Sequence, residues 1–345
     1  MSFRHEKLLV SRGVRSGLPI AVAVHSTRLG PAVGGCRMWP YPDWRDGVRD
    51  ALRLSAAMTL KCAVAGLPTG GGKAVVVLPP GQRPDPARRR DVLLDLGDVV
   101  ESLGGGYRTA EDVGTGTADM AIVRERTSHV LGLTGEPAAP TARGVFAALE
   151  ATVARFAGDP EPGGLRVVIS GLGQVGSRLA RMLAERGAVL TATDVDPAKR
   201  AVAAELGATW VAPGEEFTVP AEVFVPAGIG GVLTREVIDE LRCRAVVGPA
   251  NNQLAEDDGD LRLAARDILW TPDFVANAGG VVHTYLREAE GVDADVAEAR
   301  VRGIGDTVAD LFERAERDRV TPLAAAKALA TERLRGGAEL MAVPA

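Results

Sequence analysis

The stretch Val167–Asp196, VVISGLGQVGSRLARMLAERGAVLTATDVD, decides the fold. The β-branched run at its start predicts a buried strand, which leads directly into a glycine-rich turn. Apolar residues then recur at helical spacing, and a second apolar run, Val189–Thr193, ends in Asp194. This order of strand, glycine turn, helix, strand and acid is typical of a dinucleotide-binding unit.

The glycine turn follows the pattern GxGxxG. Gly171 permits the tight turn, Gly173 lets the backbone approach a pyrophosphate, and Gly176 lets helix and strand pack closely. The following helix N-terminus offers N–H groups and a partial positive charge to the phosphates. A glycine turn without a ligand is the competing interpretation, and the strand and helix around the turn disfavour it. The predicted cofactor-binding residues of the turn are Gly171, Gly173, Gln174, Val175 and Gly176.

Asp194 lies roughly 20 residues beyond the motif, where a ribose-binding carboxylate is expected. A carboxylate there would repel a 2′-phosphate, so the sequence predicts NAD rather than NADP as the cofactor. Lys199 and Arg200 follow closely and would weaken that repulsion.

Composition excludes several classes of protein. The chain has 345 residues, 46% of them hydrophobic, which is enough for two cores of ordinary size. A net charge of −5 argues against binding to nucleic acid or to a membrane surface. The three cysteines have no CxxC spacing, so neither a disulfide framework nor a metal site is indicated. No signal peptide or membrane span is recognised, and we expect a cytoplasmic protein.

Strands alternate with helices along the whole chain. From Leu165 onward the pattern predicts a doubly wound parallel sheet, and helices dominate after Asn277. The segment Gly132–Pro140 is rich in glycine and proline and is predicted to be a hinge. Thr141 is predicted to cap a helix over Arg143–Phe156.

Two lysines and an aspartate are the candidates for chemistry in the first part of the chain. Lys73 follows a glycine triplet, predicted to be a turn, and is expected to begin a strand. Lys61 lies on the apolar face of a helix predicted over Trp44–Leu67. Two lysines in one cleft would repel each other, and the pKa of one would fall until it acts as a base. Asp112, in a loop, is the natural partner. Solvated lysines and a turn aspartate remain the ordinary alternative.

These motifs together resemble the glutamate/leucine/phenylalanine/valine dehydrogenase family, with the phenylalanine, leucine and valine dehydrogenases most similar. The resemblance covers about Val24 to Leu334. Its motifs are Leu29-Gly30-Pro31-Ala32-Val33-Gly34-Gly35, Met58-Thr59-Leu60-Lys61, Gly70-Gly71-Gly72-Lys73, Glu111-Asp112-Val113-Gly114-Thr115, Ala250-Asn251-Asn252 and Asn277-Ala278-Gly279-Gly280.

The resemblance implies an α/β fold with two domains around a cleft. It implies a substrate and oligomerisation domain at 1–140, a Rossmann NAD-binding domain at 141–290, and C-terminal helices at 291–345 that pack back on the cleft. The implied activity is reversible oxidative deamination of an amino acid to a 2-oxo acid and ammonia by a homo-oligomer. A catalytically silent NAD-binding regulator and a 2-hydroxy-acid dehydrogenase are the alternatives.

The resemblance also assigns roles to single residues. Lys73 would activate water and Asp112 would exchange protons with the amino group. Lys61 would hold the substrate α-carboxylate, near the backbone of Gly34 and Gly35. Asn277 would begin the segment that closes the substrate pocket. The residues implied to lie near the nicotinamide are Thr141, Asn251 and Asn252.

The implied side-chain pocket is mostly apolar. Its wall consists of Val33, Met58, Ala110, Val281 and Thr284. Because no lysine belongs to this wall, an acidic substrate would lack a counterion. We therefore expect a hydrophobic substrate, with phenylalanine slightly ahead of leucine and valine.

Overall fold

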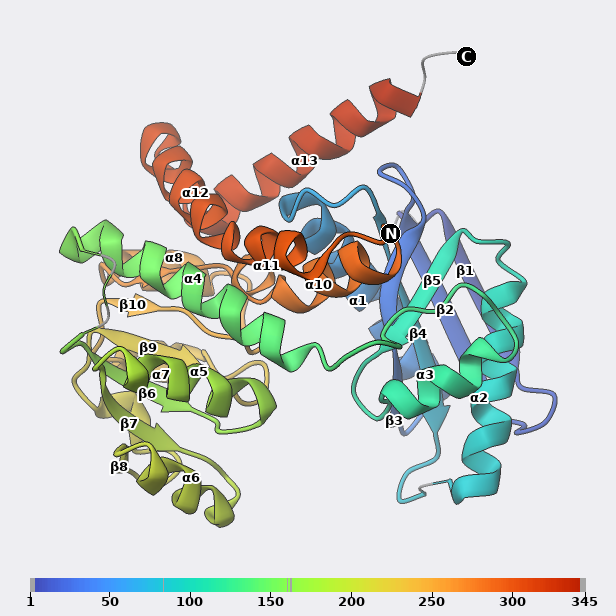
Figure 1. Ribbon diagram of the computed structural model, residues 1–345, viewed down its shortest axis with the longest axis horizontal. Coiled ribbons are helices and arrows are strands. Elements are labelled where there is room, and N and C mark those ends of the chain that lie inside the picture. Colours follow the sequence, from blue (N-terminus) through green and yellow to red (C-terminus); the bar gives the residue numbers. More distant parts are fainter. Residues whose placement is uncertain (1–3, 83, 160, 162, 342–345) are drawn as a thin grey trace. The chain divides into compact units, whose positions relative to one another are not determined.

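The computed structural model describes residues 4–82, 84–159, 161 and 163–341. The chain divides into two compact units. Unit 1 comprises Met1–Glu136, Thr284–Val292 and Leu329–Ala345, and unit 2 comprises Pro137–His283 and Asp293–Ala328. Each unit is built around one β-sheet (Figure 1).

The sheet of unit 1 is mixed. In spatial order its strands are β1 (Lys7–Arg12), β2 (Pro19–Ser26), β4 (Gly70–Leu78), β3 (Ala32–Pro40) and β5 (Tyr107–Glu111). Strands β1 and β2 are antiparallel to their neighbours, and β3 runs parallel to both β4 and β5. The helices of this part are α1 (Trp44–Val64), α2 (Pro86–Glu101) and α3 (Thr117–Arg124).

Alternation along β4 divides unit 1 into two cores. Ala74, Val76 and Leu78 belong to the core that α2 and α3 complete. Val75 and Val77 belong to a smaller core with Ala51 of α1. Because side chains two residues apart lie on the same face of a strand, Lys73 shares the α1 face with Val75 and Val77.

The glycine triplet before Lys73 is part of strand β4, and the predicted turn is wrong. None of the three glycines has a positive φ. A Cβ on Gly71 would overlap the backbone nitrogen of Thr59 in α1, and one on Gly70 would overlap the carbonyl oxygen of Ser26 in β2. The glycines therefore permit close packing, and they place Lys73 inside the strand.

The sheet of unit 2 is entirely parallel. Its spatial order is β11 (Leu269–Trp270), β10 (Ala245–Val246), β9 (Val223–Pro226), β6 (Arg166–Ser170), β7 (Val189–Thr193) and β8 (Thr209–Trp210). The order reverses direction at β6, so the predicted doubly wound parallel sheet is confirmed. Its helices are α5 (Gln174–Glu185), η1 (Pro197–Lys199), α6 (Arg200–Glu205), η2 (Glu216–Thr218), α7 (Arg235–Glu240), α8 (Gly259–Ala265) and α9 (Asp273–Ala276).

Helix α4 (Ala138–Ala157) begins earlier than the sequence predicted. Thr141 therefore lies in its first turn and donates its hydroxyl to the carbonyl of Pro137 at 2.7 Å. The predicted capping role of Thr141 is wrong, because the helix already includes that residue.

The remaining helices are α10 (Gly279–Glu288), α11 (Ala294–Arg302), α12 (Ile304–Asp318) and α13 (Pro322–Met341). Among the described residues, none of the helices has the length and apolarity needed to cross a membrane.

Candidate active site

Lys73 and Asp112 form a nearly buried ion pair in unit 1. Lys73 is only 5% exposed, and its Nζ lies 2.8 Å from Oδ2 of Asp112. Asp112 directly follows β5, whose parallel register with β3 brings the loop after Glu111 beside Cys36. A Cβ on Gly35 would lie 2.8 Å from Cβ of Asp112, so the glycine makes room for this carboxylate.

A short turn fixes the backbone of Asp112. Thr115 Oγ1 accepts a hydrogen bond from the Asp112 N–H at 3.0 Å and donates to the carbonyl of Cys36 at 2.8 Å. Gly114 adopts φ +84° next to the carbonyl of Met38, where any side chain would clash. The Asp112-Val113-Gly114-Thr115 motif therefore has a local structural reason for its glycine and for its threonine.

The charge of Asp112 is set by two cations. Burial opposes ionisation of this carboxyl group, but Lys73 and Arg37 outweigh burial and hold the pKa of Asp112 below its usual range. From the sequence we expected Lys73 to share a cleft with Lys61 and to have Asp112 as its partner. The structure pairs Lys73 with Asp112, whose carboxylate neutralises the charge of the ammonium. Lys61 lies half-buried in the last turn of α1.

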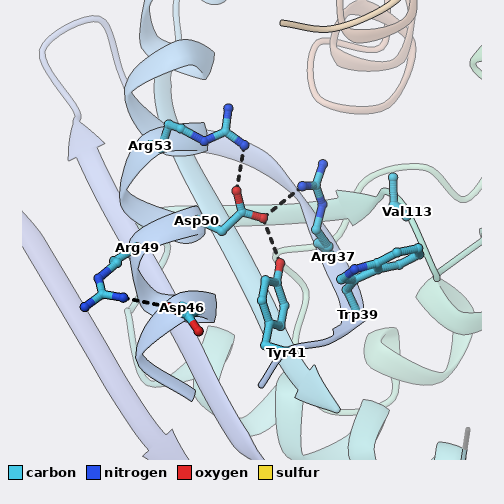
Figure 2. Close-up of a pocket in the computed structure, with 8 residues that line it drawn as sticks. All are labelled: Arg37, Trp39, Tyr41, Asp46, Arg49, Asp50, Arg53 and Val113. Atoms are coloured by element: carbon cyan, nitrogen blue, oxygen red, sulfur yellow. Dashed lines mark hydrogen bonds and ion pairs between the residues drawn. The ribbon is translucent and has the colours of Figure 1, made fainter. Parts of the chain in front are cut away.

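Arg37 was missed by the sequence analysis. It lies on β3, with Nε 3.1 Å from Oδ2 of Asp112 and Nη1 2.8 Å from Oδ2 of Asp50. Tyr41 and Arg53 also donate to Asp50, each at 2.7 Å. Figure 2 shows these side chains around a pocket of about 480 Å³ in unit 1. No local sequence motif predicts this cluster, because its members come from β3, from the segment that follows β3, and from α1.

The predicted wall residues of unit 1 lie close to the same sheet face. Val33 and Gly35 of β3 are in register with Arg108 and Ala110 of β5. Because Tyr107 points into the opposite core, Arg108 and Ala110 face the α1 side, as Lys73 does. Val33 is 2% exposed, whereas Met58 of α1 and Thr284 of α10 are half-buried. A Cβ on Gly34 would overlap the carbonyl oxygen of Gly72, so this glycine serves strand packing.

Arg108 is a second residue that the sequence analysis missed. Its side chain is half-buried, and it makes no hydrogen bond or ion pair with the described residues. It lies beside Val33 on the face that carries Lys73, so a cation stands next to a wall that was expected to be uncharged.

In unit 2 the glycine turn has the geometry of an anion site. Gly171 adopts φ +114° and Gly176 packs against the carbonyl of Gly171, so neither position accommodates a side chain. A Cβ on Gly173 would meet nothing within 4 Å. Gly173 precedes α5 without a side-chain cap, which leaves the first N–H groups of α5, from Gln174 and Val175 onward, available to a ligand.

Asp194 lies half-buried at the carboxyl end of β7. Its Oδ2 accepts a hydrogen bond from the N–H of Leu172 at 2.6 Å, and its Oδ1 accepts one from Asp196 at 2.9 Å. The carboxylate thus also fixes the glycine turn, a structural role that the sequence analysis did not assign to it.

Two of the predicted polar residues of unit 2, Asn277 and Asn251, are hydrogen-bonded to each other. Asn277 donates to the carbonyl of Pro249 at 3.1 Å and to the side-chain oxygen of Asn251 at 2.9 Å. Its own Oδ1 is buried and has no partner among the described residues. Asn252 adopts φ +52° and donates its N–H to Asp273 at 2.7 Å. An unused buried acceptor at Asn277 is suited to a ligand N–H donor.

Thr141 and Val281 lie at the start of neighbouring helices in unit 2. A Cβ on Gly280 would lie 2.6 Å from Oγ1 of Thr141, so α10 starts close against α4. Val281, in the first turn of α10, is half-buried. Within the described part of the chain, no three His, Cys, Asp or Glu side chains are grouped so as to hold a metal ion.

The fold and these motifs define an amino-acid dehydrogenase of two α/β domains. Residues 13–129 match the family model described as "Glu/Leu/Phe/Val dehydrogenase, dimerisation domain", and residues 197–336 match "Glutamate/Leucine/Phenylalanine/Valine dehydrogenase". The chain belongs to this family, and the resemblance inferred from the sequence is confirmed.

Relatives of three specificities are similar over most of their length. A leucine dehydrogenase of Thermoactinomyces intermedius is 38% identical, covering 96% of this chain and 91% of that protein. A valine dehydrogenase of Streptomyces virginiae is 39% identical, covering 96% and 94%. The crystal structure of L-tryptophan dehydrogenase from Nostoc punctiforme superposes with a TM-score of 0.84 at 36% identity, covering 97% and 96%. The predicted two-domain α/β fold is thereby confirmed.

Proposed function

We propose that this protein catalyses the NAD-dependent, reversible oxidative deamination of a hydrophobic L-amino acid to a 2-oxo acid and ammonia. The observation that carries the proposal is the buried pair of Lys73 and Asp112. Proton transfers to and from water and an amino group need an acid and a base side by side, shielded from solvent.

The roles of the site residues follow from this chemistry. Lys61 binds the α-carboxylate of the substrate. Asp112 takes a proton from the substrate amino group, so that a neutral amine is present when Cα loses its hydride. Lys73 takes a proton from the water that attacks the resulting iminium. Asp112 then returns its proton to nitrogen. As the C–N bond breaks and ammonia leaves, Asp112 takes the proton of the carbinolamine hydroxyl group, which becomes the carbonyl of the 2-oxo acid. Reductive amination is the reverse.

Unit 2 supports NAD as the cofactor. The open side of Gly173 and the uncapped N-terminus of α5 suit a pyrophosphate. Asp194 suits the ribose hydroxyl groups, and the free Oδ1 of Asn277 suits a carboxamide donor near Thr141, Asn251 and Asn252. A nicotinamide held by these residues would supply the hydride acceptor for Cα. Gly173 has no side chain that would cover the N-terminus of α5, so a pyrophosphate could approach the backbone there.

The wall of the side-chain pocket supports an apolar substrate. Of the residues expected in this wall, Val33, Met58 and Ala110 in unit 1 and Val281 in unit 2 are apolar, and Thr284 in unit 1 is uncharged. Arg108 is the charged exception. A guanidinium stacks on aromatic rings, which favours phenylalanine over leucine and valine.

The family membership disfavours the 2-hydroxy-acid alternative. The test of the proposal, and of the silent-regulator alternative, is absorbance at 340 nm with NAD and a panel of amino acids. We expect turnover with phenylalanine, leucine or valine. Binding of NAD without turnover on any amino acid would favour the regulator.

We also propose a cytoplasmic homo-oligomer. The description of the 13–129 match as a dimerisation domain supports an oligomer. A hetero-hexameric glutamate dehydrogenase from Thermus thermophilus, 25% identical with a TM-score of 0.82, is a structural relative. Light scattering coupled to size exclusion measures the mass, and a monomer would contradict the proposal.

A further inference from the structure

We propose that Arg37 is a positioning residue for the reaction, anchored by Asp50, which orients Asp112 and keeps it ionised. This inference rests on the proposed function. Its evidence is the continuous set of contacts Lys73–Asp112–Arg37–Asp50, in which each charge touches one of opposite sign.

The contacts to Asp112 distinguish its two oxygens. Lys73 Nζ, at 2.8 Å, and Arg37 Nε, at 3.1 Å, both approach Oδ2. Among the described residues, Oδ1 receives no hydrogen bond. Two cations on one oxygen fix the rotation of the carboxylate and leave Oδ1 for the amino group of the substrate. Lys73 alone would fix one point of the carboxylate, whereas the planar guanidinium adds a directional second contact.

Arg37 is itself held from the other side. Its Nη1 donates to Oδ2 of Asp50 at 2.8 Å, and the same oxygen accepts from Tyr41 at 2.7 Å. The second oxygen of Asp50 accepts from Arg53. The side chain of Asp50 is 14% exposed, and that of Arg37 is 22% exposed. Because these side chains are mostly buried and Arg37 contacts a carboxylate on each side, Arg37 cannot turn away from Asp112 without straining its contact to Asp50.

The positive charge of Arg37 is permanent, whereas that of Lys73 is not. Lys73 must give up its proton to act as a base, and the ammonium then stops stabilising Asp112. A guanidinium stays protonated at every working pH. Arg37 thus keeps a positive charge beside Asp112 throughout the cycle. Asp50 provides a second carboxylate partner for the guanidinium of Arg37. Burial works against the charge of Arg37, yet Asp112 and Asp50 outweigh it and raise the pKa of Arg37.

Replacement of Arg37 by methionine tests the positioning role. We expect kcat to fall about 10- to 100-fold with KM for the amino acid nearly unchanged. The acidic limb of the pH profile of kcat/KM should move upward by about one pH unit, because Asp112 loses one of two cations that lower its pKa. Asp50→Asn should move the acidic limb of this pH profile in the same direction by a smaller amount, because Asp50 acts on Asp112 only through Arg37.

The matched control is Arg49→Met. Arg49 lines the same pocket and pairs with Asp46 at 2.6 Å, but it is not among the partners of Asp50 or Asp112. We expect its kcat and pH profile to equal those of the wild type. A purely structural ion pair at Arg37 would lower the melting temperature of Arg37→Met without moving its pH profile, and that result would overturn the inference.

The pocket permits a second test by chemical rescue. Because Arg37 lines it, Arg37→Ala should leave a space that a guanidinium ion reaches from solution. Millimolar guanidinium should restore part of kcat to Arg37→Ala and none to Lys73→Ala. Absence of rescue together with an unshifted pH profile in Arg37→Gln would also overturn the inference, even if Arg37→Met failed to fold.

Failure of the proposed function is recognised separately. If the wild type oxidises no amino acid in the panel, the proposed function fails. The titration of the Asp112 carboxyl carbon by ¹³C NMR in wild type and Arg37→Gln, which removes the charge, then still tests whether Arg37 holds the pKa of Asp112 down. Equal titration midpoints in these two proteins would overturn the inference without reference to activity.

Discussion

The ammonium group of Lys73 lies 2.8 Å from the carboxylate of Asp112, and the side chain of Lys73 is only 6% exposed. Asp112 is 23% exposed, but burying the ammonium group of Lys73 costs desolvation energy that the Coulomb attraction of the pair only partly returns. Its presence on a strand face lined by glycines is therefore better explained by chemistry than by stability. Replacing one partner should accordingly affect turnover more than it affects folding.

We expect Lys73→Ala to lower kcat by at least about 10³-fold, because the base that activates water is removed. NAD binding should survive, since the glycine turn and Asp194 belong to unit 2. Initial rates at 340 nm and NAD titration by fluorescence measure the two quantities. A kcat near that of the wild type would remove Lys73 from the mechanism.

We expect Asp112→Asn to reduce both reaction directions by about 10²- to 10⁴-fold, because an amide does not exchange the required proton. In the wild type, Lys73 and Arg37 lower the pKa of Asp112 despite its burial, so the carboxylate stays ionised well into the acidic range. Activity that depends on Asp112 should therefore be lost only as the pH falls below the usual range of a carboxyl group. Retention of most activity in Asp112→Asn would leave Asp112 a structural turn residue.

Asp95 of α2 provides a prediction about stability. Its side chain is 2% exposed and accepts hydrogen bonds from the backbone N–H groups of Arg15 and Ser16 and from both side chains. Asp95→Ala leaves these donors without an acceptor and should lower the free energy of unfolding by about 2 kcal/mol. Chemical unfolding at pH 7 measures the change, and Asp91→Ala, on the same helix, is the control.

The effect of Asp95 should depend on pH. Burial raises the pKa of Asp95, but the hydrogen bonds from Ser16 and Arg15 outweigh burial and lower it overall. Its stabilisation is therefore present above the unfolded-state pKa of about 3.9 and is lost as the pH falls through the lower folded-state value. A stability difference between wild type and Asp95→Ala that stayed constant well below that pH would contradict this assignment.

The dinucleotide turn could be predicted from the sequence because its signal is local. Gly171, Gly173 and Gly176 sit between a β-branched run and a helical repeat, and no distant residue is needed to recognise them. The partnership of Lys73 with Asp112 could also be predicted, but only from chemical complementarity and family resemblance. The geometry that unites them depends on the register of β3 with β5, which no local pattern encodes.

The parts that sequence reasoning missed depend on tertiary contacts. Strand β3 contains adjacent glycines, and β4 begins with three, so both starts look like turns. The glycines of β3 are required by close packing against β4 and β5, and those at the start of β4 by packing against β2 and α1, which only the assembled sheet shows. The pairing of Arg37 with Asp50 joins a strand to the helix that follows it, and either residue alone reads as a solvated charge.

We expect Asp194 to confer preference for NAD over NADP, because its carboxylate suits ribose hydroxyl groups and repels a 2′-phosphate. Asp194→Ser should raise the ratio of kcat/KM for NADP to that for NAD at least about tenfold, or ~1.4 kcal/mol. Asp196→Ser, in the same loop, is the control. Equal use of both cofactors by the wild type would contradict the preference and would point to Lys199 or Arg200. Arg200 already lies 5.4 Å over the ring of Trp210.

The last prediction concerns the substrate side chain. The proposed wall has small apolar residues at Val33 and Ala110, with Arg108 in register beside Val33. We expect kcat/KM to rank phenylalanine above leucine and valine, and all three far above glutamate. Arg108→Met should reduce the advantage of phenylalanine over leucine by about two- to fivefold, since a guanidinium stacked on a ring contributes about 0.5–1 kcal/mol at an exposed site.

The panel also contains the outcome that would overturn this assignment. A half-buried guanidinium without a partner attracts a carboxylate at least as strongly as a ring. Glutamate as the best substrate of the wild type, with that preference lost in Arg108→Met, would make Arg108 the counterion of an acidic side chain. The apolar-pocket assignment would then be wrong. Leucine or valine as the best substrate would instead leave the pocket apolar and remove only the stacking role of Arg108.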